Sequence, residues 1–497
     1  MIFSPTKDDY LSLLNLLGRI LTILGSLFLI PAVIAFILKE INPLYDFILS
    51  FFICESIGLA LLLFFNLKKE LNYSLTFLFV ALLWVIVPLI GSLPLWLSGN
   101  FHSFLDAFFD AMSGFATTGL SVIQNVDHLP FSVNFWRHFM MFLGGQGIVI
   151  VAISFASEAS AYSLGLYVGE AREEKLLPNI IDTARFIWLV SFVYFVIGSL
   201  ALFFLGLQAG LPIKKAGFHS IFLFMAAFDT GGFTPQSMNI FYYHSFIFEL
   251  ATVFLMILGA FNFNLHYFIW LKKRKEILRN IETRAFVVSF TVLFLFLSLA
   301  LLSKADFSFL EFFRKGFYQI ITAHTGCGFS NIYPGQLASW PREALIFIII
   351  AMAFGGGIGS TTGGIKLMRV ALLGKAVISE VKEWLFPARA RVYEKYHHLQ
   401  DTVLRDERIR MVFIVSFFYF LSYFIGGVIG TFYGYPFLES LFESTSAAAN
   451  VGLSVGITQA SMPAGLKMAY IIQMWSGRLE FISIIVGLGV LFSSLKR

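Results

Sequence analysis

The chain has 497 residues, of which 58% are hydrophobic and only 13% are charged, and 60 of them are phenylalanine. Soluble proteins carry about 25% charged residues, so the composition excludes a soluble protein and indicates a polytopic membrane protein. The net charge of +5 does not indicate nucleic-acid binding, because the basic residues are placed as membrane topology requires.

Apolar runs long enough to cross a bilayer, which takes roughly 17–25 residues, occur ten times in the chain. The predicted spans are 12–38, 43–66, 75–98, 134–155, 184–207, 243–270, 284–303, 341–378, 410–433 and 463–492. The first ten residues are polar and the apolar run after them is too long for a signal peptide, so we expect no cleavable leader.

Lysine and arginine concentrate in alternate connections between these spans. The basic connections are 67–74, 169–185, 271–284, 366–410 and the C-terminus. By the positive-inside rule, we expect these connections and both termini to lie in the cytoplasm. The connections on the other side are long and poor in charge, and each contains an apolar stretch too short to span.

Those four short stretches resemble one another. Aligned on one glycine each, they read TTGLS, TGGFT, GCGFS and NVGLS around Gly119, Gly232, Gly328 and Gly452. An aromatic residue stands ten positions before each glycine: Phe109, Phe222, Tyr318 and Phe442. One such motif carries no information, but four of them with matching lead-ins, each between two spans, indicate an internal repeat.

The predicted fold is therefore all-α, with two N-terminal helices followed by four pseudo-symmetric helix–pore loop–helix repeats around a central ion pore. The expected boundaries are 1–70 for the N-terminal pair and 71–168, 169–275, 276–395 and 396–497 for the repeats. Irregular backbone at membrane depth is tolerated only inside protein or beside water. Four such loops around one axis form a ring of carbonyl oxygens that can replace the hydration shell of an alkali cation.

Two details of the loops lead to further expectations. The hydroxyl residue two positions after each glycine is expected to fix the loop by bonding to backbone. In HTGCGFS, residues 324–330, His324 and Cys327 suggest half of a metal site. A structural zinc site needs four ligands, and no second pair has matching spacing. We therefore interpret the stretch as one loop of the four, in which Cys327 contributes its carbonyl, and we expect no disulfide to Cys54.

The four loops, GSTTGGIK at 359–366 and the arginine in MWSGRLE at 474–480 resemble the Trk/Ktr/HKT superfamily of potassium transport proteins, and most closely its TrkH branch. The resemblance implies K⁺ uptake through a selectivity filter, and no enzymatic activity or organic cofactor. The residues it assigns to K⁺ in the filter are Thr117, Thr118, Gly119, Thr230, Gly231, Gly232, Cys327, Gly328, Asn450, Val451 and Gly452. Serine at the first glycine accompanies sodium transport in plant relatives, so Gly119 favours K⁺.

The loops depart from the family pattern at three places. Ala116 and the pair Gly326-Cys327 stand where threonine is usual, which leaves the coordination in the third quadrant open. Asp229 stands three positions before its glycine. It either raises the cation concentration at a solvated mouth or caps a turn.

The long run 341–378 contains the candidate gate. As one helix it would be about 57 Å long, nearly twice the ~30 Å hydrocarbon core, and its centre is rich in glycine. We expect a break into a loop that obstructs the pore below the filter, as in the family; the alternative is a glycine face for helix packing. The gate residues are Gly355, Gly356, Gly357, Gly359, Ser360, Thr361, Thr362, Gly363, Gly364 and Arg478. Arg478, halfway along the last span, either opposes cation leak or forms a structural ion pair.

The resemblance also implies partners and a location. It predicts a homodimer embedded in membrane lipid, in the bacterial inner membrane, with a cytoplasmic ring of nucleotide-binding regulatory subunits of the TrkA/KtrA type. Two transport alternatives stay open, a sodium-selective member of the same fold and a symporter coupled to H⁺ or Na⁺, for which Asp229 is the obvious titratable group. A membrane-embedded enzyme would need clustered carboxylates or histidines, and it would leave the fourfold repeat unexplained.

Overall fold

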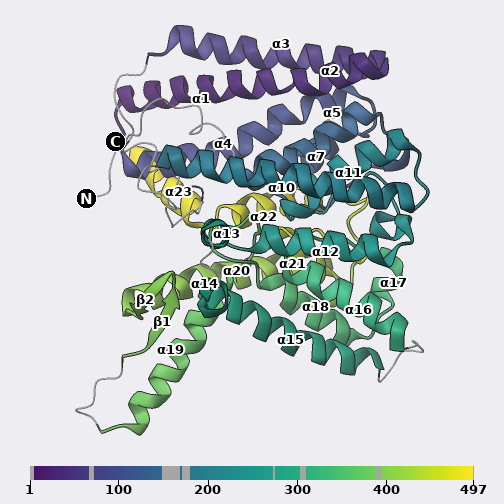
Figure 1. Ribbon diagram of the computed structural model, residues 1–497. Coiled ribbons are helices and arrows are strands. Elements are labelled where there is room, and N and C mark those ends of the chain that lie inside the picture. Colours follow the sequence, from purple (N-terminus) through teal and green to yellow (C-terminus); the bar gives the residue numbers. More distant parts are fainter. Residues whose placement is uncertain are drawn as a thin grey trace.

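The computed structural model describes residues 5–66, 72–147, 168, 170, 180–271, 275–302, 309–387 and 393–495. The parts of the predicted span 134–155 and of the basic connections 67–74, 169–185, 271–284 and 366–410 that fall in the gaps lie outside the described residues. So do the expected boundaries at 70/71 and 168/169. The described chain is a bundle of helices that run alongside one another (Figure 1).

Three helices form the N-terminal segment at one edge of the bundle (Figure 1): α1 (Lys7–Leu27), α2 (Leu29–Leu38) and α3 (Ile41–Phe64). Small residues let α1 and α3 approach closely. A methyl group at Gly18 would lie 2.9 Å from the carbonyl oxygen of Gly58, and one at Gly58 would lie 2.8 Å from the side chain of Thr22. The first predicted span, 12–38, corresponds to α1 and α2, which are interrupted only at Phe28.

The rest of the chain repeats one arrangement four times, namely a first helix, a buried short helix that we call the pore helix, and a second helix. The first helices are α4 (Tyr73–Gly91), α10 (Ile180–Gln208), α15 (Ile281–Leu302) and α20 (Asp406–Phe432). The pore helices are α6 (Phe104–Phe115), α11 (Ile213–Phe228), α16 (Phe309–His324) and α21 (Phe437–Ala448). The second helices are α7 (Phe131–Gln146), α12 (Phe246–Ala260), α18 (Arg342–Ala353) and α22 (Ala464–Arg478).

Shorter elements connect or extend these helices. They are α5 (Leu93–Leu97), η1 (Val126–His128), η2 (Asn239–Tyr243), α13 (Phe263–Trp270), α14 (Lys275–Arg279), α17 (Pro334–Ala338), α19 (Leu367–Leu385), α23 (Ile482–Leu495) and the strands β1 (Lys395–His398) and β2 (Gln400–Val403). The strands pair as an antiparallel hairpin, with Tyr396 opposite Thr402.

The prediction of unbroken spans is wrong at 243–270 and 463–492, whereas the break in 341–378 is the expected one and part of 134–155 lies outside the described residues. Among the described residues, six helices are long and apolar enough to cross a membrane, and two further candidates are helix pairs bent by 102°, α12 with α13 and α22 with α23. The bend after α12 follows from Asn262, whose side-chain oxygen caps α13. The bend after α22 follows from Glu480 and Phe481, which both have positive φ. Arg478 therefore lies at the end of α22, at the break in the middle of the bent pair.

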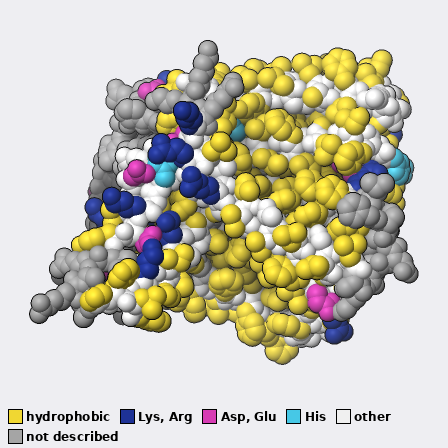
Figure 2. Space-filling model, turned by 60° about the horizontal axis from the view of Figure 1, so that its bottom comes forward, with side chains coloured by type: hydrophobic (Ala, Val, Ile, Leu, Met, Phe, Trp, Pro, Cys, Tyr) yellow, Lys and Arg dark blue, Asp and Glu magenta, His cyan; other side chains and the backbone are white. Residues whose placement is uncertain are grey.

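The surface matches a membrane protein with one basic end. α1 begins and α23 ends at the side of the bundle that carries α14, α19 and the β hairpin (Figure 1). Figure 2 shows hydrophobic side chains across the middle of one face, with most of the visible lysines and arginines gathered at the hairpin end. Exposed apolar residues occur on several of the first helices, for example Phe192 on α10, Leu299 on α15 and Phe413 on α20.

Candidate ion pathway

All four pore helices end in the same backbone conformation. The residue two positions before each aligned glycine has positive φ: Thr117 at 54°, Thr230 at 50°, Gly326 at 70° and Asn450 at 54°. The next amide then bonds back across the helix end, from Thr118 to Ser113 O at 2.8 Å, Gly231 to Ala226 O at 2.8 Å, Cys327 to Thr322 O at 3.0 Å and Val451 to Ser446 O at 2.9 Å. This is the Schellman arrangement, which satisfies carbonyl groups at a helix end. Gly326 thus occupies the slot that threonine or asparagine fills elsewhere.

The four aligned glycines form a closed ring. Their φ angles are 92°, 77°, 80° and 95° for Gly119, Gly232, Gly328 and Gly452, a region that favours glycine. A methyl group at Gly119 would lie 3.1 Å from the Cα of Gly232, one at Gly232 would lie 3.5 Å from the carbonyl carbon of Gly328, and one at Gly328 would lie 3.0 Å from the Cα of Gly452. One at Gly452 would lie 3.0 Å from the Cα of Gly119, which completes the circuit.

Carbonyl oxygens occupy the narrow gaps between these glycines. The oxygen of the residue before each glycine would collide with a side chain on the neighbouring glycine; these residues are Thr118, Gly231, Cys327 and Val451. The Cys327 thiol points away, 3.5 Å from the carbonyl oxygen of Ala226. Each quadrant therefore contributes the same backbone atoms whatever its side chain.

A polar residue on three of the pore helices binds the chain segment that follows the glycine. Ser121 donates to Asp110, Gln319 donates to Ser330 at 3.0 Å, and Ser454 donates to Glu443. The predicted bond from the hydroxyl to backbone is present at Thr234 and Ser330. It is present at Ser121 and Ser454 as well, where the hydroxyl accepts from Ile123 N at 3.4 Å and from Gly456 N at 2.9 Å while it donates to the carboxylate nine positions before the glycine.

The carboxylate of Asp110 is also paired with an arginine from the second helix of its repeat. Arg137 Nε lies 2.7 Å from Asp110 Oδ2, and both side chains are buried. The guanidinium of Arg137 also lies over the ring of Phe233, 4.2 Å from its centroid, so it joins the first quadrant to the second. Glu249 on α12 likewise pairs with Arg314 on α16 at 2.6 Å.

Asp229 lies behind the ring and not at a mouth. It is the C-cap of α11 and is fully buried, which makes the interpretation as a solvated carboxylate wrong. Gln146 Nε2 donates to its Oδ1 at 2.8 Å, and Ser191 Oγ donates to Gln146 Oε1 at 2.9 Å. Asp229 therefore connects the end of one pore helix to the end of α7.

The predicted break in 341–378 is present, since helix α18 ends at Ala353 and α19 begins at Leu367. Between them the chain folds into a compact loop, 355–366, closed by a bridge between Phe354 and Ile365 and by a bond from Gly355 N to Ile365 O at 2.9 Å. Within it, Gly356 N donates to Thr362 Oγ1 at 2.9 Å. The glycines serve close packing of this loop and not of a continuous helix.

Thr361 in this loop contacts the residues that precede the ring glycines, and we call that side of the ring the side below it. Its Oγ1 lies 3.1 Å from Thr230 Oγ1 and donates to Gly259 O at 3.0 Å. Its carbonyl accepts from Thr117 Oγ1 at 3.5 Å. A methyl group at Gly363 would lie 2.7 Å from Asn450 Oδ1. The loop also lies next to the third quadrant, since a methyl group at Gly326 would lie 3.6 Å from Thr362 Cβ, so it approaches the positive-φ residues of all four quadrants.

Arg478 connects this loop to the first quadrant. Its Nη1 donates to Thr361 O at 2.8 Å and to Thr117 Oγ1 at 3.2 Å, and its Nη2 donates to Gly144 O at the end of α7. The guanidinium also faces the ring of Trp84 at 5.4 Å. The positive charge of Arg478 thus lies against the loop and the first quadrant, with backbone and hydroxyl oxygens among its acceptors.

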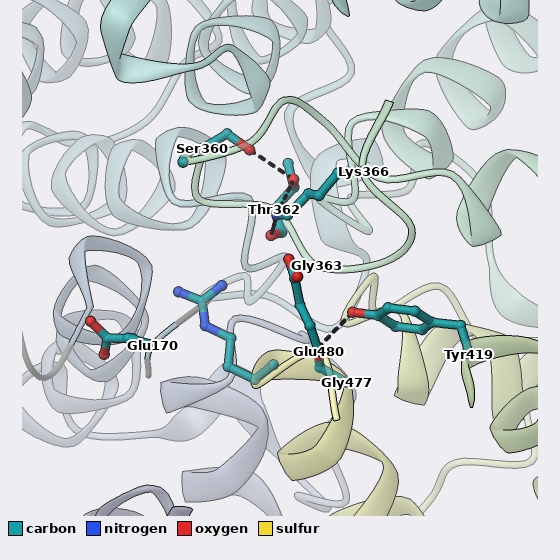
Figure 3. A pocket seen from close by; sticks show the side chains of 10 residues that line it. Glu170, Ser360, Thr362, Gly363, Lys366, Tyr419, Gly477 and Glu480 are labelled. Carbon is teal, nitrogen blue, oxygen red and sulfur yellow. Dashed lines mark hydrogen bonds between the residues drawn. The ribbon is translucent and has the colours of Figure 1, made fainter. Parts of the chain in front are cut away.

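A small polar cavity of about 20 Å³ lies between the loop, Arg478 and Glu480. Figure 3 shows Glu170, Lys366 and Glu480 around it, from three separate segments of the chain, with Tyr419 donating to Gly477 O. Lys366 Nζ donates to Thr362 Oγ1 at 3.3 Å, and Glu480 pairs with Arg369 at the start of α19. Buried charges of both signs therefore surround the loop at the hairpin side.

Three glycines outside the predicted motifs position the second helices. A side chain at Gly144, Gly259 or Gly477 would collide with the backbone oxygen of Phe115, Phe228 or Ala448, near the end of the adjoining pore helix. The signal is present in the sequence, because a small residue stands 25 positions after Gly119, Gly328 and Gly452 and 27 after Gly232. In the third repeat the corresponding small residue is Ala353.

The surroundings of His324 and Cys327 do not support a metal site. His324 Nε2 lies 2.8 Å from Ser289 Oγ, and its ring stacks on Phe286 at 5.0 Å. Cys54 and Cys327 are both free. In the described part of the chain no group of three or more His, Cys, Asp or Glu residues is placed to hold a metal ion.

Comparison with known proteins agrees with this architecture. The profile of the family described as "TrkH: Cation transport protein" matches residues 44–495. An uncharacterized cation transporter from Methanocaldococcus jannaschii is 32% identical and covers 99% of this chain and 98% of its own. The potassium uptake protein TrkG of the Escherichia coli Trk system is 29% identical, covering 92% of this chain and 93% of its own.

A solved structure has the same fold. The crystal structure of the potassium transporter TrkH from Vibrio parahaemolyticus aligns with a TM-score of 0.79 and 25% identity, over 96% of this chain and 98% of that one. The family match covers most of the chain, including all four glycine loops, the loop 355–366 and Arg478. The chain belongs to the TrkH family of cation transport proteins and is not an enzyme.

Proposed function

We propose that this chain takes up K⁺ across a cell membrane through the ring of Gly119, Gly232, Gly328 and Gly452. The observation that carries the proposal is the closed circuit of four loops with equivalent backbone, each presenting a carbonyl oxygen to its neighbour. Carbonyl rings of this kind replace the hydration shell of an alkali cation. The similarity to proteins named for potassium uptake supports K⁺ as the transported ion.

In this proposal the backbone oxygens of Thr118, Gly231, Cys327 and Val451 take over from water as the ion enters. The Schellman bonds hold the four loops in place, and the buried pair of Asp110 and Arg137 holds the first quadrant against the second. Rigidity matters because the loops must keep a fixed spacing while ions pass. The remaining assigned residues, Thr117, Thr230 and Asn450, would form the lower rim.

The loop 355–366 and Arg478 form the gate in this proposal. Thr361 lies below the ring, and Arg478 binds it there, so a permeating ion would meet both the loop and a positive charge. Opening would require the loop to leave Thr230 and Arg478 to lose its bond to Thr361. Lys366, which is bonded to Thr362, would move with the loop.

A reversal-potential measurement tests the transport proposal and separates it from its alternatives. The purified chain in proteoliposomes would face opposed K⁺, Na⁺ and pH gradients. We expect the reversal potential to follow K⁺ alone. A potential set by Na⁺ alone would establish the sodium-selective alternative. One that depends on K⁺ together with Na⁺ or with pH would establish coupled symport, and Asp229→Asn is the matched variant for H⁺ coupling.

Topology, repeats and partners belong to the same proposal. The basic end that carries the β hairpin would face the cytoplasm together with both termini, and the repeats would divide at the predicted boundaries. That end offers a surface for the expected ring of regulatory subunits, and the apolar faces offer one for a second copy. Labelling of cysteines introduced at Lys382 and Ser237 from either side of the membrane tests the orientation. Size measurement of the purified protein, alone and with a TrkA-type subunit, tests the assembly.

A further inference from the structure

The β hairpin and the loop 355–366 share one small hydrophobic core, separate from the main core of the bundle. We call it the hairpin core, and its members come from five segments: Ile281, Ile358, Met368, Leu372, Tyr396 and Val412. Ile358 belongs to the loop, Met368 and Leu372 follow it on α19, and Tyr396 is on β1. Burial of apolar groups is non-directional and acts on all the members together. A shift of the hairpin therefore changes the packing around Ile358 and Met368, near the two ends of the loop.

A buried carboxylate at the start of α15 fixes the loop beside this core. Glu282 is only 3% exposed, and its Oε1 accepts the Ile358 amide at 2.6 Å. Its Oε2 accepts from Asn262 Nδ2 at 3.4 Å and would lie 2.9 Å from a methyl group at Gly357. A carboxylate that accepts a backbone amide makes a strong bond. Glu282 thus holds the beginning of the loop against the bend between α12 and α13.

The hairpin is bonded to the same junction between α14 and α15. His398 Nδ1 lies 3.4 Å from Asn280 Oδ1, and that oxygen also accepts the Glu282 amide at 2.9 Å. One residue earlier, His397 lies between two carboxylates, 3.1 Å from Glu276 and 2.7 Å from Asp401. The hairpin and the loop are therefore both attached to the few residues that begin α15.

Ile358 also has room to move. A cavity of about 30 Å³ lies next to it, lined by Ile358, Met368, Leu372, Met411, Val412 and Val415, with Arg369 and Arg408 at its edge. Packed cores tend to switch between discrete arrangements and do not deform smoothly. A void beside the one apolar side chain that the loop inserts into the hairpin core permits a second arrangement.

We propose that Glu282 and Tyr396 are positioning residues of the gate, through which a displacement of the hairpin 395–403 on the side of the basic end releases the loop 355–366. The inference rests on the proposed gate function of that loop. Neither residue touches the ring of glycines, so both act on opening and not on ion preference.

Flux measurements on purified protein in proteoliposomes test the inference. We expect Glu282→Ala and Tyr396→Ala each to raise basal K⁺ flux about tenfold, because each removes one attachment of the closed loop. Glu282→Gln should restore most of the closure, since its amide oxygen still accepts the Ile358 amide. Tyr393→Ala is the matched control, because Tyr393 is 64% exposed just before the hairpin and should leave flux unchanged.

Selectivity is the second readout. The K⁺ to Na⁺ permeability ratio should stay at the parent value in every variant, and a changed ratio would overturn the inference because it would place the effect in the ring. Unchanged flux in Glu282→Ala and Tyr396→Ala, or an equal rise in Tyr393→Ala, would also overturn it. If Tyr396→Ala does not yield folded protein, Tyr396→Leu, which keeps an apolar side chain, takes its place with a smaller expected rise.

A deletion within the loop separates this inference from the gate proposal. Deleting 359–363 should raise flux, and adding Glu282→Ala or Tyr396→Ala to the deletion should then change nothing further. If the deletion leaves flux unchanged, the gate proposal itself fails. If the deletion raises flux while the point variants do not, or if their effects add to it, only the coupling through Glu282 and the hairpin fails.

Discussion

Replacing Arg478 by alanine gives the sharpest prediction for the gate. The guanidinium makes one direct bond to the loop, to Thr361 O at 2.8 Å, and two to the first quadrant, at Thr117 and Gly144. A hydrogen bond to a charged group contributes roughly 1.5–3 kcal/mol. Losing the bond to Thr361 should therefore shift the balance between closed and open loop by roughly 10- to 150-fold, since each 1.4 kcal/mol is about tenfold.

Basal K⁺ flux into proteoliposomes measures this shift. Arg478→Ala should conduct at least tenfold faster than the parent, and Arg478→Lys should fall between the two, because lysine keeps the charge but cannot bind Thr361 and Gly144 at once. Arg410→Ala on the exposed face of α20 is the matched control. Unchanged or reduced flux in Arg478→Ala, with the protein inserted and its permeability ratio intact, would refute the reasoning.

Three further predictions concern the ring, the buried ion pair and the hairpin. Gly232→Ala should lower the K⁺ to Na⁺ permeability ratio, because its methyl group meets the Cys327 carbonyl. The control is Gly210→Ala, which has a similar positive φ but open space around it and should leave the ratio unchanged. Equal ratios in the two variants would exclude the ring as the filter. Asp110→Ala should reduce unfolding stability by about 3–5 kcal/mol, because it leaves the charge of Arg137, 1% exposed, without its partner. Glu394→Ala, whose partner Lys382 is 45% exposed, should cost less than about 1 kcal/mol in the same thermal melt. Glu276 and Asp401 raise the pKa of His397 above its ordinary 6.5, so its contribution to hairpin docking is complete below that value and is lost as pH rises through the raised pKa. Hydrogen-exchange protection of β1 and β2 should accordingly fall with rising pH in the parent but not in His397→Gln, and protection that rises with pH would contradict the assignment.

The repeat was predictable because its signal is local. Gly119, Gly232, Gly328 and Gly452 stand at equivalent points of four similar segments, and the glycine run after Ala353 is too long for one straight helix. Both features depend on residues close together in the sequence. The aligned glycines and the break in the helix therefore followed from the sequence alone, as did the membrane class.

The contacts between segments far apart in the sequence were not predictable in this way. Asp110 and Arg137 are 27 residues apart, Glu282 and Ile358 are 76 apart, and Arg478 reaches Gly144 across 334 residues. No spacing rule connects such pairs. The bends after Ala260 and Arg478 were missed because the apolar composition continues through them, and only backbone conformation at Asn262 and Glu480 interrupts the helix.

The shared orientation of the four pore helices has an electrostatic consequence. Each ends at the ring, and a helix C-terminus carries roughly half a negative charge, so the space below the ring receives about two negative charges without any carboxylate. That potential stabilises a dehydrated cation, and it equally stabilises the guanidinium of Arg478, which explains how an arginine is tolerated there. If the proposed pathway is correct, Arg478 would act there as a tethered cation in the place of a permeating one. Conduction would then be a competition between a fixed and a mobile cation for the same negative potential.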